Sequence, residues 1–340
     1  MTETAPLKWY NIRDWGVEGQ GWADTLCPYD RLPARAEKLV RPPVWDLSRS
    51  AIGMCAFFET DAPAIHARWQ LRTPQLGEAN FPVAAFSGLD LYGDDAGTWR
   101  WIAAGHQVKD QRPEFCLVEG MEATPRRYLL YLPLRNPVDK VEIGLPAGAR
   151  LTPVAPRREK PVVFYGTSIV HGAYASHAGI VHPSVLGRRL NKPIINLGFS
   201  GNAQMEPELA KLLAELDAAA YVLDALPNMD LALVKERGEA FIRMLCQARP
   251  GVPVVLVEDR PWANYWVRPA IRRMHEEKWR EFRTIYRKLR DAGFVQLSYV
   301  EGKHLFGMDG EGSPDSSHPS DLGFVRMADA LEDVLRAVVV

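Results

Sequence analysis

The second half of the chain alternates short apolar runs with longer amphipathic stretches, and this alternation limits the possible folds more than any other feature. Five apolar runs of strand length occur after residue 160, at Pro161–Tyr165, Pro193–Leu197, Ala220–Leu226, Val252–Val257 and Phe294–Tyr299. Helical patterns lie between and after them, over His182–Leu190, Pro207–Leu216, Leu231–Ala248, Tyr265–Ala292 and Ser320–Val338. Strands that alternate with helices predict an α/β fold in which helices cover both faces of a parallel sheet.

The first half follows a different pattern. Seven of the ten tryptophans precede residue 102, and short strand-like segments alternate with turn residues such as those at Tyr92–Asp95. The expected strands are Gly53–Glu59, Ile65–Leu71, Val83–Ala85, Trp99–Ala103, Tyr128–Leu132 and Lys140–Gly144. Many short strands with regular turns predict an antiparallel sandwich. Because Leu151–Lys160 carries two prolines and several charges, we expect a sandwich domain over 1–155 and an α/β domain over 156–340.

Composition excludes several classes of function. Acidic and basic residues nearly cancel, leaving a net charge of −1, so we expect neither nucleic acid nor a membrane as partner. The chain has no apolar run of transmembrane length and no secretory signal at its start, which predicts a cytoplasmic protein. No His or Cys spacing is typical of a metal site, so we expect no metal and no cofactor. Scattered free thiols are the expected state of Cys27, Cys55, Cys116 and Cys246.

Two strings far apart in the chain supply a nucleophile, a base and a group that orients the base. Tyr165–Ile169 follows the first apolar run and places Ser168 at a strand-to-helix turn. Asp315 stands three residues before His318, so both can face the same way on one helical turn. A histidine can take the serine proton while a carboxylate fixes its tautomer. Taken singly, Ser168 could instead be a helix N-cap and Asp315 a turn residue.

Polar groups also follow the second and third apolar runs of this half. Gly201 would allow a bare backbone N–H to approach an oxyanion, and the Asn228 side chain can donate a hydrogen bond without titrating. The alternatives are an ordinary glycine-rich loop and a helix cap. Asp230 fits the cap of the next helix better, which leaves Asn228 free.

These residues resemble a known family. In chain order, Gly166–Ile169, Gly198–Gly201, Leu226–Met229 and Asp315–Pro319 are similar to the four blocks of the SGNH hydrolases, also called GDSL esterases. The resemblance covers about residues 160–338 and implies a flavodoxin-like, doubly wound sheet of five parallel strands. Thr167 stands where the commonest family form has Asp, and the third block lacks the usual Gly-x-Asn-Asp form. Both departures resemble the form that these blocks take in a recognised branch of the family.

Carried over block by block, the resemblance implies roles for five residues. The catalytic triad would be Ser168, Asp315 and His318. The oxyanion hole would be the Ser168 and Gly201 backbone N–H groups with the Asn228 side chain.

The first half carries a further block. Gly88–Tyr92 looks like the Gly-x-Asp-Leu-Tyr motif of a sandwich domain, jelly-roll-like in form, that accompanies this branch. We therefore expect a serine esterase that removes a short acyl group, acetyl above all, from a sugar or glycoside. An acyltransferase with the same triad is the main alternative, and a carbohydrate-binding relic without turnover is a further one. Substrate-binding candidates are His171, Arg260 and Trp262, although packing would also explain them. The oligomeric state, including a homo-oligomer, stays open.

Overall fold

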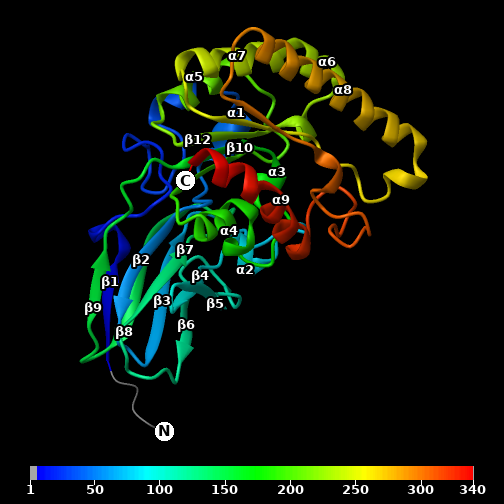
Figure 1. Ribbon diagram of the computed structural model, residues 1–340. Coiled ribbons are helices and arrows are strands. Elements are labelled where there is room, and N and C mark those ends of the chain that lie inside the picture. Colours follow the sequence, from blue (N-terminus) through cyan, green and yellow to red (C-terminus); the bar gives the residue numbers. More distant parts are fainter. Residues whose placement is uncertain (1–5, 340) are drawn as a thin grey trace. The chain divides into compact units, whose positions relative to one another are not determined.

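The computed structural model of the protein describes residues 6–339, which form two compact units (Figure 1). The first unit comprises the described residues up to Ala34, Arg49–Arg158 and Ser176–Gly179. The second comprises Arg35–Ser48, Glu159–Ala175 and the described residues from Ile180 onward. Each unit therefore includes a short segment from the sequence range of the other. The single boundary expected after residue 155 stays a prediction.

The first unit is built from two antiparallel sheets. One has the strand order β1-β8-β3-β6 and the other β5-β4-β7-β2-β9. The strands are β1 (Leu7–Asn11), β2 (Cys55–Thr60), β3 (Ala64–Leu71), β4 (Asp90–Asp95), β5 (Thr98–Ala104), β6 (Glu114–Glu119), β7 (Arg126–Tyr131), β8 (Val138–Pro146) and β9 (Leu151–Val154). Every second side chain of β3 is buried, and those between are half-buried or exposed. Trp69 of β3 and Phe58 of β2 share one core. The predicted sandwich is confirmed.

Three details of the first unit differ from expectation. Val83–Ala85, expected as a strand, lies in a short helix, α2 (Val83–Phe86). The reason is that Pro82 begins a helical turn, in which the Pro82 carbonyl oxygen accepts hydrogen bonds from two backbone N–H groups. The segment Tyr92–Asp95, expected as a turn, belongs to β4, and the hairpin turns at Ala96 and Gly97, both with positive φ. The start of the expected junction, Leu151–Val154, pairs with β2 as strand β9.

The second unit contains a five-stranded parallel sheet in the order β11-β10-β12-β13-β14. The strands are β10 (Val162–Gly166), β11 (Ile194–Gly198), β12 (Ala220–Asp224), β13 (Val254–Val257) and β14 (Leu297–Val300). Numbered along the chain, this is the flavodoxin-like order 2-1-3-4-5, as the resemblance implies. The first four strands are buried throughout because helices cover both faces, which explains their continuous apolar sequences.

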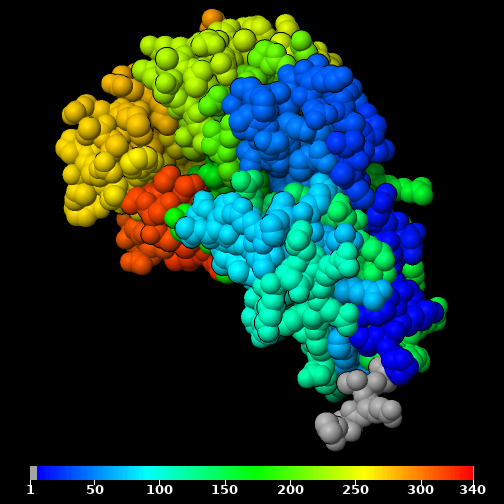
Figure 2. Space-filling view, turned by 180° about the vertical axis from the view of Figure 1, so that it is seen from behind, coloured from blue at the N-terminus to red at the C-terminus, as the bar shows by residue number. Residues whose placement is uncertain are grey.

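Helices α5, α7 and α8 lie over one face of the sheet, and α4 and α9 lie over the other (Figure 1). The helices of this unit are α1 (Pro42–Ser48), α3 (Ser168–His171), α4 (His182–Arg189), α5 (Pro207–Glu215), α6 (Leu231–Leu233), α7 (Glu239–Ala248), α8 (Pro269–Asp291) and α9 (Asp321–Val339). Figure 2 shows α8 as a protruding gold surface beside the yellow-green segment that contains α6 and α7. None of the helices within residues 6–339 has the length and apolar composition that crossing a membrane requires.

Two expected helices are interrupted. The pattern over Leu231–Ala248 forms α6, a π-helical turn (Val234–Gly238) and α7. The pattern that starts at Tyr265 opens with a 3₁₀ turn (Tyr265–Val267), and α8 begins at Pro269. Proline is favoured at the first helical position because its missing N–H has no intrahelical acceptor there.

Candidate active site

Ser168 is the first residue of α3, directly beyond the carboxyl end of β10. The residue that caps α3 is Thr167, whose side chain accepts from the Ile169 N–H. The serine hydroxyl is therefore not used as a cap. Gly166 has no room for a side chain, since a Cβ there would lie 2.4 Å from Val170 and 2.8 Å from the Asp224 carbonyl oxygen. This tight strand-to-helix turn projects Ser168 from the sheet edge.

A continuous hydrogen-bonded series joins Ser168, His318 and Asp315. Ser168 Oγ lies 2.8 Å from His318 Nε2, and His318 Nδ1 lies 2.7 Å from Asp315 Oδ2. Since the Asp315 carboxylate accepts a hydrogen bond from Nδ1–H, the neutral ring presents Nε2 as an acceptor toward the serine hydroxyl. Burial disfavours the charged Asp315, but hydrogen bonds from His318 and from the Ser317 N–H outweigh it and hold the pKa of Asp315 below its ordinary value.

The Asp315–His318 segment is not the helical turn that its spacing predicts. Asp315 Oδ1 accepts from the backbone N–H groups of Ser317 (2.9 Å) and His318 (2.8 Å), and Ser316 has a left-handed φ of 77°. Asp315 is thus a turn-forming residue and the partner of His318 at once, one oxygen for each role. The following helix, α9, begins at Asp321 and not at Ser320, so Pro319 precedes it.

Three hydrogen-bond donors follow neighbouring strands. In the sheet, Gly166 of β10 pairs with Gly198 of β11 and with Asp224 of β12, so the loops carrying Ser168, Gly201 and Asn228 start side by side. Asn228 Oδ1 accepts from the Ala203 N–H at 3.2 Å, which leaves the amide NH₂ as the free end. Within residues 6–339, no hydrogen bond engages the Ser168 N–H, the Gly201 N–H or the Asn228 NH₂.

Asp230 caps the helix after Asn228, as its position predicts. Its side chain accepts from the Leu233 N–H at 2.8 Å at the start of α6. The prediction that Asp230, and not Asn228, takes this cap is confirmed.

The loop after β13 braces the turn that carries His318. The Ala263 N–H donates to the Ser316 carbonyl oxygen at 2.8 Å, and the Trp262 N–H donates to His275 Nε2 at 3.3 Å. The loop is anchored by Asp259, which pairs with Lys278 and lies 3.0 Å from His275 Nδ1. Burial disfavours ionised Asp259, yet the Lys278 charge and the hydrogen bond from His275 lower its pKa to about 2.

A cavity of about 670 Å³ opens beside Asn228. Trp262 and Ser317 line it, together with Met274 and Leu231 from the flanking helices. The other two substrate-binding candidates do not. His171 is fully buried on α3, and Arg260 is 1% exposed and paired with Asp224.

Tyr174 is a neighbour of the site that the sequence does not mark. Its ring centroid lies 5.6 Å from that of His318. Burial and then the Asp315 charge raise the pKa of Tyr174. Tyr174 has a left-handed φ of 68°, a conformation uncommon for a tyrosine. No sequence motif around Tyr174 predicts its position beside His318.

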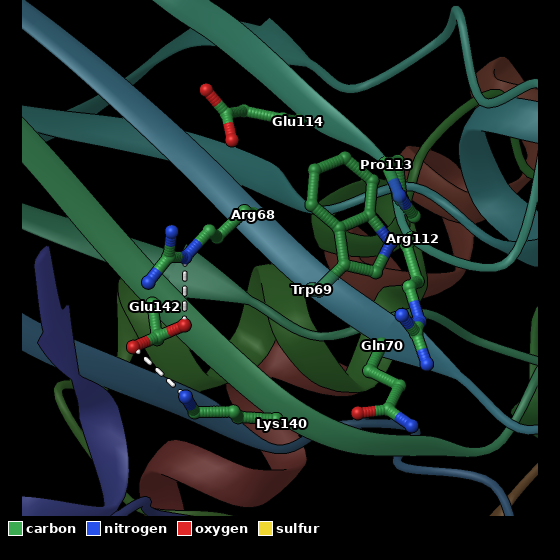
Figure 3. Close-up of a pocket in the computed structure, with 8 residues that line it drawn as sticks. All are labelled: Arg68, Trp69, Gln70, Arg112, Pro113, Glu114, Lys140 and Glu142. Carbon is green, nitrogen blue, oxygen red and sulfur yellow. Dashed lines mark hydrogen bonds and ion pairs between the residues drawn. The ribbon is translucent and has the colours of Figure 1, made fainter.

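A cavity of about 480 Å³ on the first unit has different chemistry (Figure 3). Glu142 lies between Arg68 (2.8 Å) and Lys140 (3.0 Å), so ion-paired side chains line this cavity. It brings together no nucleophile and base. In the part of the chain that the structure describes, no three His, Cys, Asp or Glu side chains are grouped to hold a metal ion.

Each half of the chain matches the sequence model of a known family. The sequence model of the GDSL-like lipase/acylhydrolase family matches residues 159–336. A second model, the N-terminus of esterases of the SGNH-hydrolase type, matches residues 7–151. No curated protein matches the chain.

Solved structures with the same fold include a candidate GDSL-like lipase from Bacteroides ovatus, 28% identical, with a TM-score of 0.92 over 98% of each chain. The salicylyl-acyltransferase SsfX3 of a tetracycline biosynthetic pathway is 20% identical, with a TM-score of 0.75 over 97% of each chain. A family two carbohydrate esterase from Cellvibrio japonicus is 12% identical, with a TM-score of 0.64 over 98% of each chain. The resemblance found in the sequence is thereby confirmed: the chain belongs to the GDSL-like lipase/acylhydrolase family and is a carboxylic ester hydrolase.

Proposed function

We propose that the protein hydrolyses short acyl esters, acetyl above all, of a sugar or glycoside through an acyl-enzyme on Ser168. The observation that carries this proposal is the series of contacts from Ser168 Oγ to His318 Nε2 (2.8 Å) and from His318 Nδ1 to Asp315 Oδ2 (2.7 Å). A nucleophile, a base and an orienting carboxylate at these distances are what serine acyl transfer needs.

In the first half-reaction, His318 takes the Ser168 proton as Oγ attacks the ester carbonyl carbon. The tetrahedral oxyanion accepts hydrogen bonds from the Ser168 N–H, the Gly201 N–H and the Asn228 NH₂, which have no protein acceptor in the described chain. The carbonyl re-forms, the bond to the alcohol oxygen breaks, and His318 returns its proton to that oxygen. Water then attacks the acyl-enzyme with His318 again as base, and the acid and free Ser168 are regenerated.

Two observations support a short acyl group on a sugar. The cavity beside Asn228, about 670 Å³, has room for a sugar ring and carries an indole wall at Trp262 on which such a ring can stack. Proteins that share the fold include the carbohydrate esterase from Cellvibrio japonicus and an acetyl xylan esterase from Butyrivibrio proteoclasticus.

An acyltransferase is the second candidate. SsfX3, which shares the fold over 97% of each chain, is a salicylyl-acyltransferase. The same acyl-enzyme would then pass its acyl group to an acceptor hydroxyl in place of water. The two outcomes differ only in what attacks the acyl-enzyme, which the arrangement of Ser168 and His318 does not select.

The decisive experiment measures hydrolysis of 4-nitrophenyl acetate by the wild type and by Ser168→Ala, with 4-nitrophenyl butyrate and octanoate for chain length. We expect turnover only in the wild type and fastest for acetate. Mass spectrometry of wild type treated with a fluorophosphonate should show one adduct at Ser168. Equal rates in both proteins would contradict the role of Ser168.

Acetylated xylose and glucose derivatives then test the alcohol. Release of acetate from them supports the esterase. Transfer to an added alcohol at the expense of free acetate would support the acyltransferase.

A further inference from the structure

The Gly-x-Asp-Leu-Tyr motif of the first unit builds a feature that ester hydrolysis does not explain. Asp90 is fully buried, and its carboxylate accepts from the Trp101 indole N–H (2.8 Å), His177 Nδ1–H (2.7 Å) and the Gly179 N–H (2.6 Å). Trp101 is nevertheless 52% exposed. A large apolar ring that a buried carboxylate fixes in place, yet leaves uncovered, is preorganised for contact with a ligand.

The chain is shaped closely around this arrangement. A Cβ on Gly179 would lie 2.3 Å from the Tyr92 ring and 2.8 Å from Asp90 Oδ2, so only glycine fits there. The centroids of the Trp101 and His177 rings are 5.4 Å apart, with 36° between their planes. The segment that supplies His177 thus sets a second ring at a fixed angle beside the exposed indole.

Trp101 and His177 form part of the wall of a cavity of about 550 Å³ in the first unit. It lies where β5 and β6, the edge strands of the two sheets, come together. The His106 and Phe115 rings, 5.5 Å apart, and the Ile102 side chain contribute apolar wall. No Asp, Glu, Lys or Arg lines this cavity, so it offers nothing to neutralise a charged ligand.

Its polar groups favour a ligand with hydroxyl groups. Because His177 donates Nδ1–H to Asp90, the neutral ring presents Nε2 as an acceptor. This nitrogen makes no hydrogen bond to any part of the chain that the structure describes. A neutral pyranose ring has the matching chemistry, since its C–H face can stack on an indole while its rim hydroxyls donate to an acceptor.

We propose that Trp101 and His177, held by Asp90, form a binding site for a neutral sugar ring on the first unit. Binding there needs none of Ser168, Asp315 or His318, so this proposal is tested independently of the proposed ester hydrolysis. Any contact with one ring is small, and a dissociation constant on the order of 1 mM is expected.

The test is ¹⁹F NMR of the full chain labelled with 5-fluorotryptophan, which gives ten tryptophan signals. Single Trp→Phe variants assign Trp101, Trp99 and Trp262. Trp99 is the matched control, because it lies on the same strand but packs on Phe57 and does not line the cavity. The probes are xylotriose and cellotriose, with glucuronic acid as an anionic sugar and benzyl alcohol as a neutral aromatic.

We expect xylotriose or cellotriose to shift the Trp101 signal saturably and to leave the Trp99 signal in place. Trp101→Ala should raise the dissociation constant about tenfold or more, while Trp99→Ala leaves it within about twofold. Binding to the Trp101→Ala variant, which lacks the reporting indole, is measured by saturation-transfer NMR. Unchanged signals of the remaining tryptophans show that each variant folds.

Three outcomes would overturn the proposal. A sugar that shifts only the Trp262 signal would place saccharide binding in the cavity beside Asn228. A Trp101 signal that responds to benzyl alcohol but to no saccharide would assign the cavity to an aromatic ligand. No response of Trp101 to any neutral sugar would remove the site altogether.

Discussion

Replacing Asn228 by alanine isolates the oxyanion-stabilising part of the proposed mechanism. The Asn228 side chain is held by one contact, from the Ala203 N–H to Oδ1 at 3.2 Å, and its NH₂ has no acceptor within residues 6–339. Truncation therefore removes a donor that the resting protein does not use. The loss of the NH₂ donor should appear in the transition state, and the loss of the Oδ1 acceptor for the Ala203 N–H should cost only about 1 kcal/mol in stability.

The magnitude follows from the chemistry of such donors. Loss of one oxyanion donor typically costs about 10²–10³ in kcat, or about 2.7–4 kcal/mol. We expect kcat for 4-nitrophenyl acetate to fall by about that factor, with KM within about threefold, because the carbonyl is bound weakly before attack. Asn228→Asp should be slower still, since a carboxylate can accept from Ala203 but sets a negative charge against the oxyanion.

The assay compares these variants with the wild type under saturating ester, with thermal unfolding as the check on folding. A kcat for Asn228→Ala within about fivefold of the wild type, in a folded protein, would refute the role given to Asn228. A loss of more than about 2 kcal/mol in stability would instead assign Asn228 to holding the Ala203 loop.

Three more changes test neighbouring parts of the argument. Asp315→Asn should lower kcat by up to about 10⁴, because an amide no longer fixes the His318 tautomer; a near-normal rate in stopped-flow assays would exclude that role. Gly201→Ala should cost about 1 kcal/mol in urea unfolding, since Gly201 has a φ of 70° with open space beside it; an unchanged midpoint would contradict this. Lys278→Met removes the cation that pairs with the buried Asp259 carboxylate and should lower the free energy of unfolding by about 3–5 kcal/mol. The pKa of Asp259 is lowered to about 2, so its stabilising contribution is complete above its unfolded value of about 3.9 and is lost as pH falls toward 2. Acid unfolding between pH 4 and 2 should therefore be less steep in Lys278→Met than in the wild type.

Local sequence determined most elements of this protein and indicated the candidate reacting groups. The buried strands of the α/β unit are continuous apolar runs, because a parallel sheet covered on both faces needs no polar side. The residues after those runs meet at one sheet edge, which is why Ser168, Gly201 and Asn228 could be proposed as site residues from the chain alone. Val83–Ala85 misled because an apolar triplet does not reveal that Pro82 starts a helical turn.

Only the tertiary structure decided how these groups are held. Spacing predicted that Asp315 and His318 share a helical turn, yet the turn depends on a left-handed Ser316 whose carbonyl accepts from Ala263, more than fifty residues earlier in the chain. The anchoring of that loop by Asp259 and Lys278, and the fixing of Trp101 and His177 by Asp90, likewise join distant residues. No local pattern encodes such contacts, because they arise when separately formed elements pack and must satisfy one another's buried polar groups.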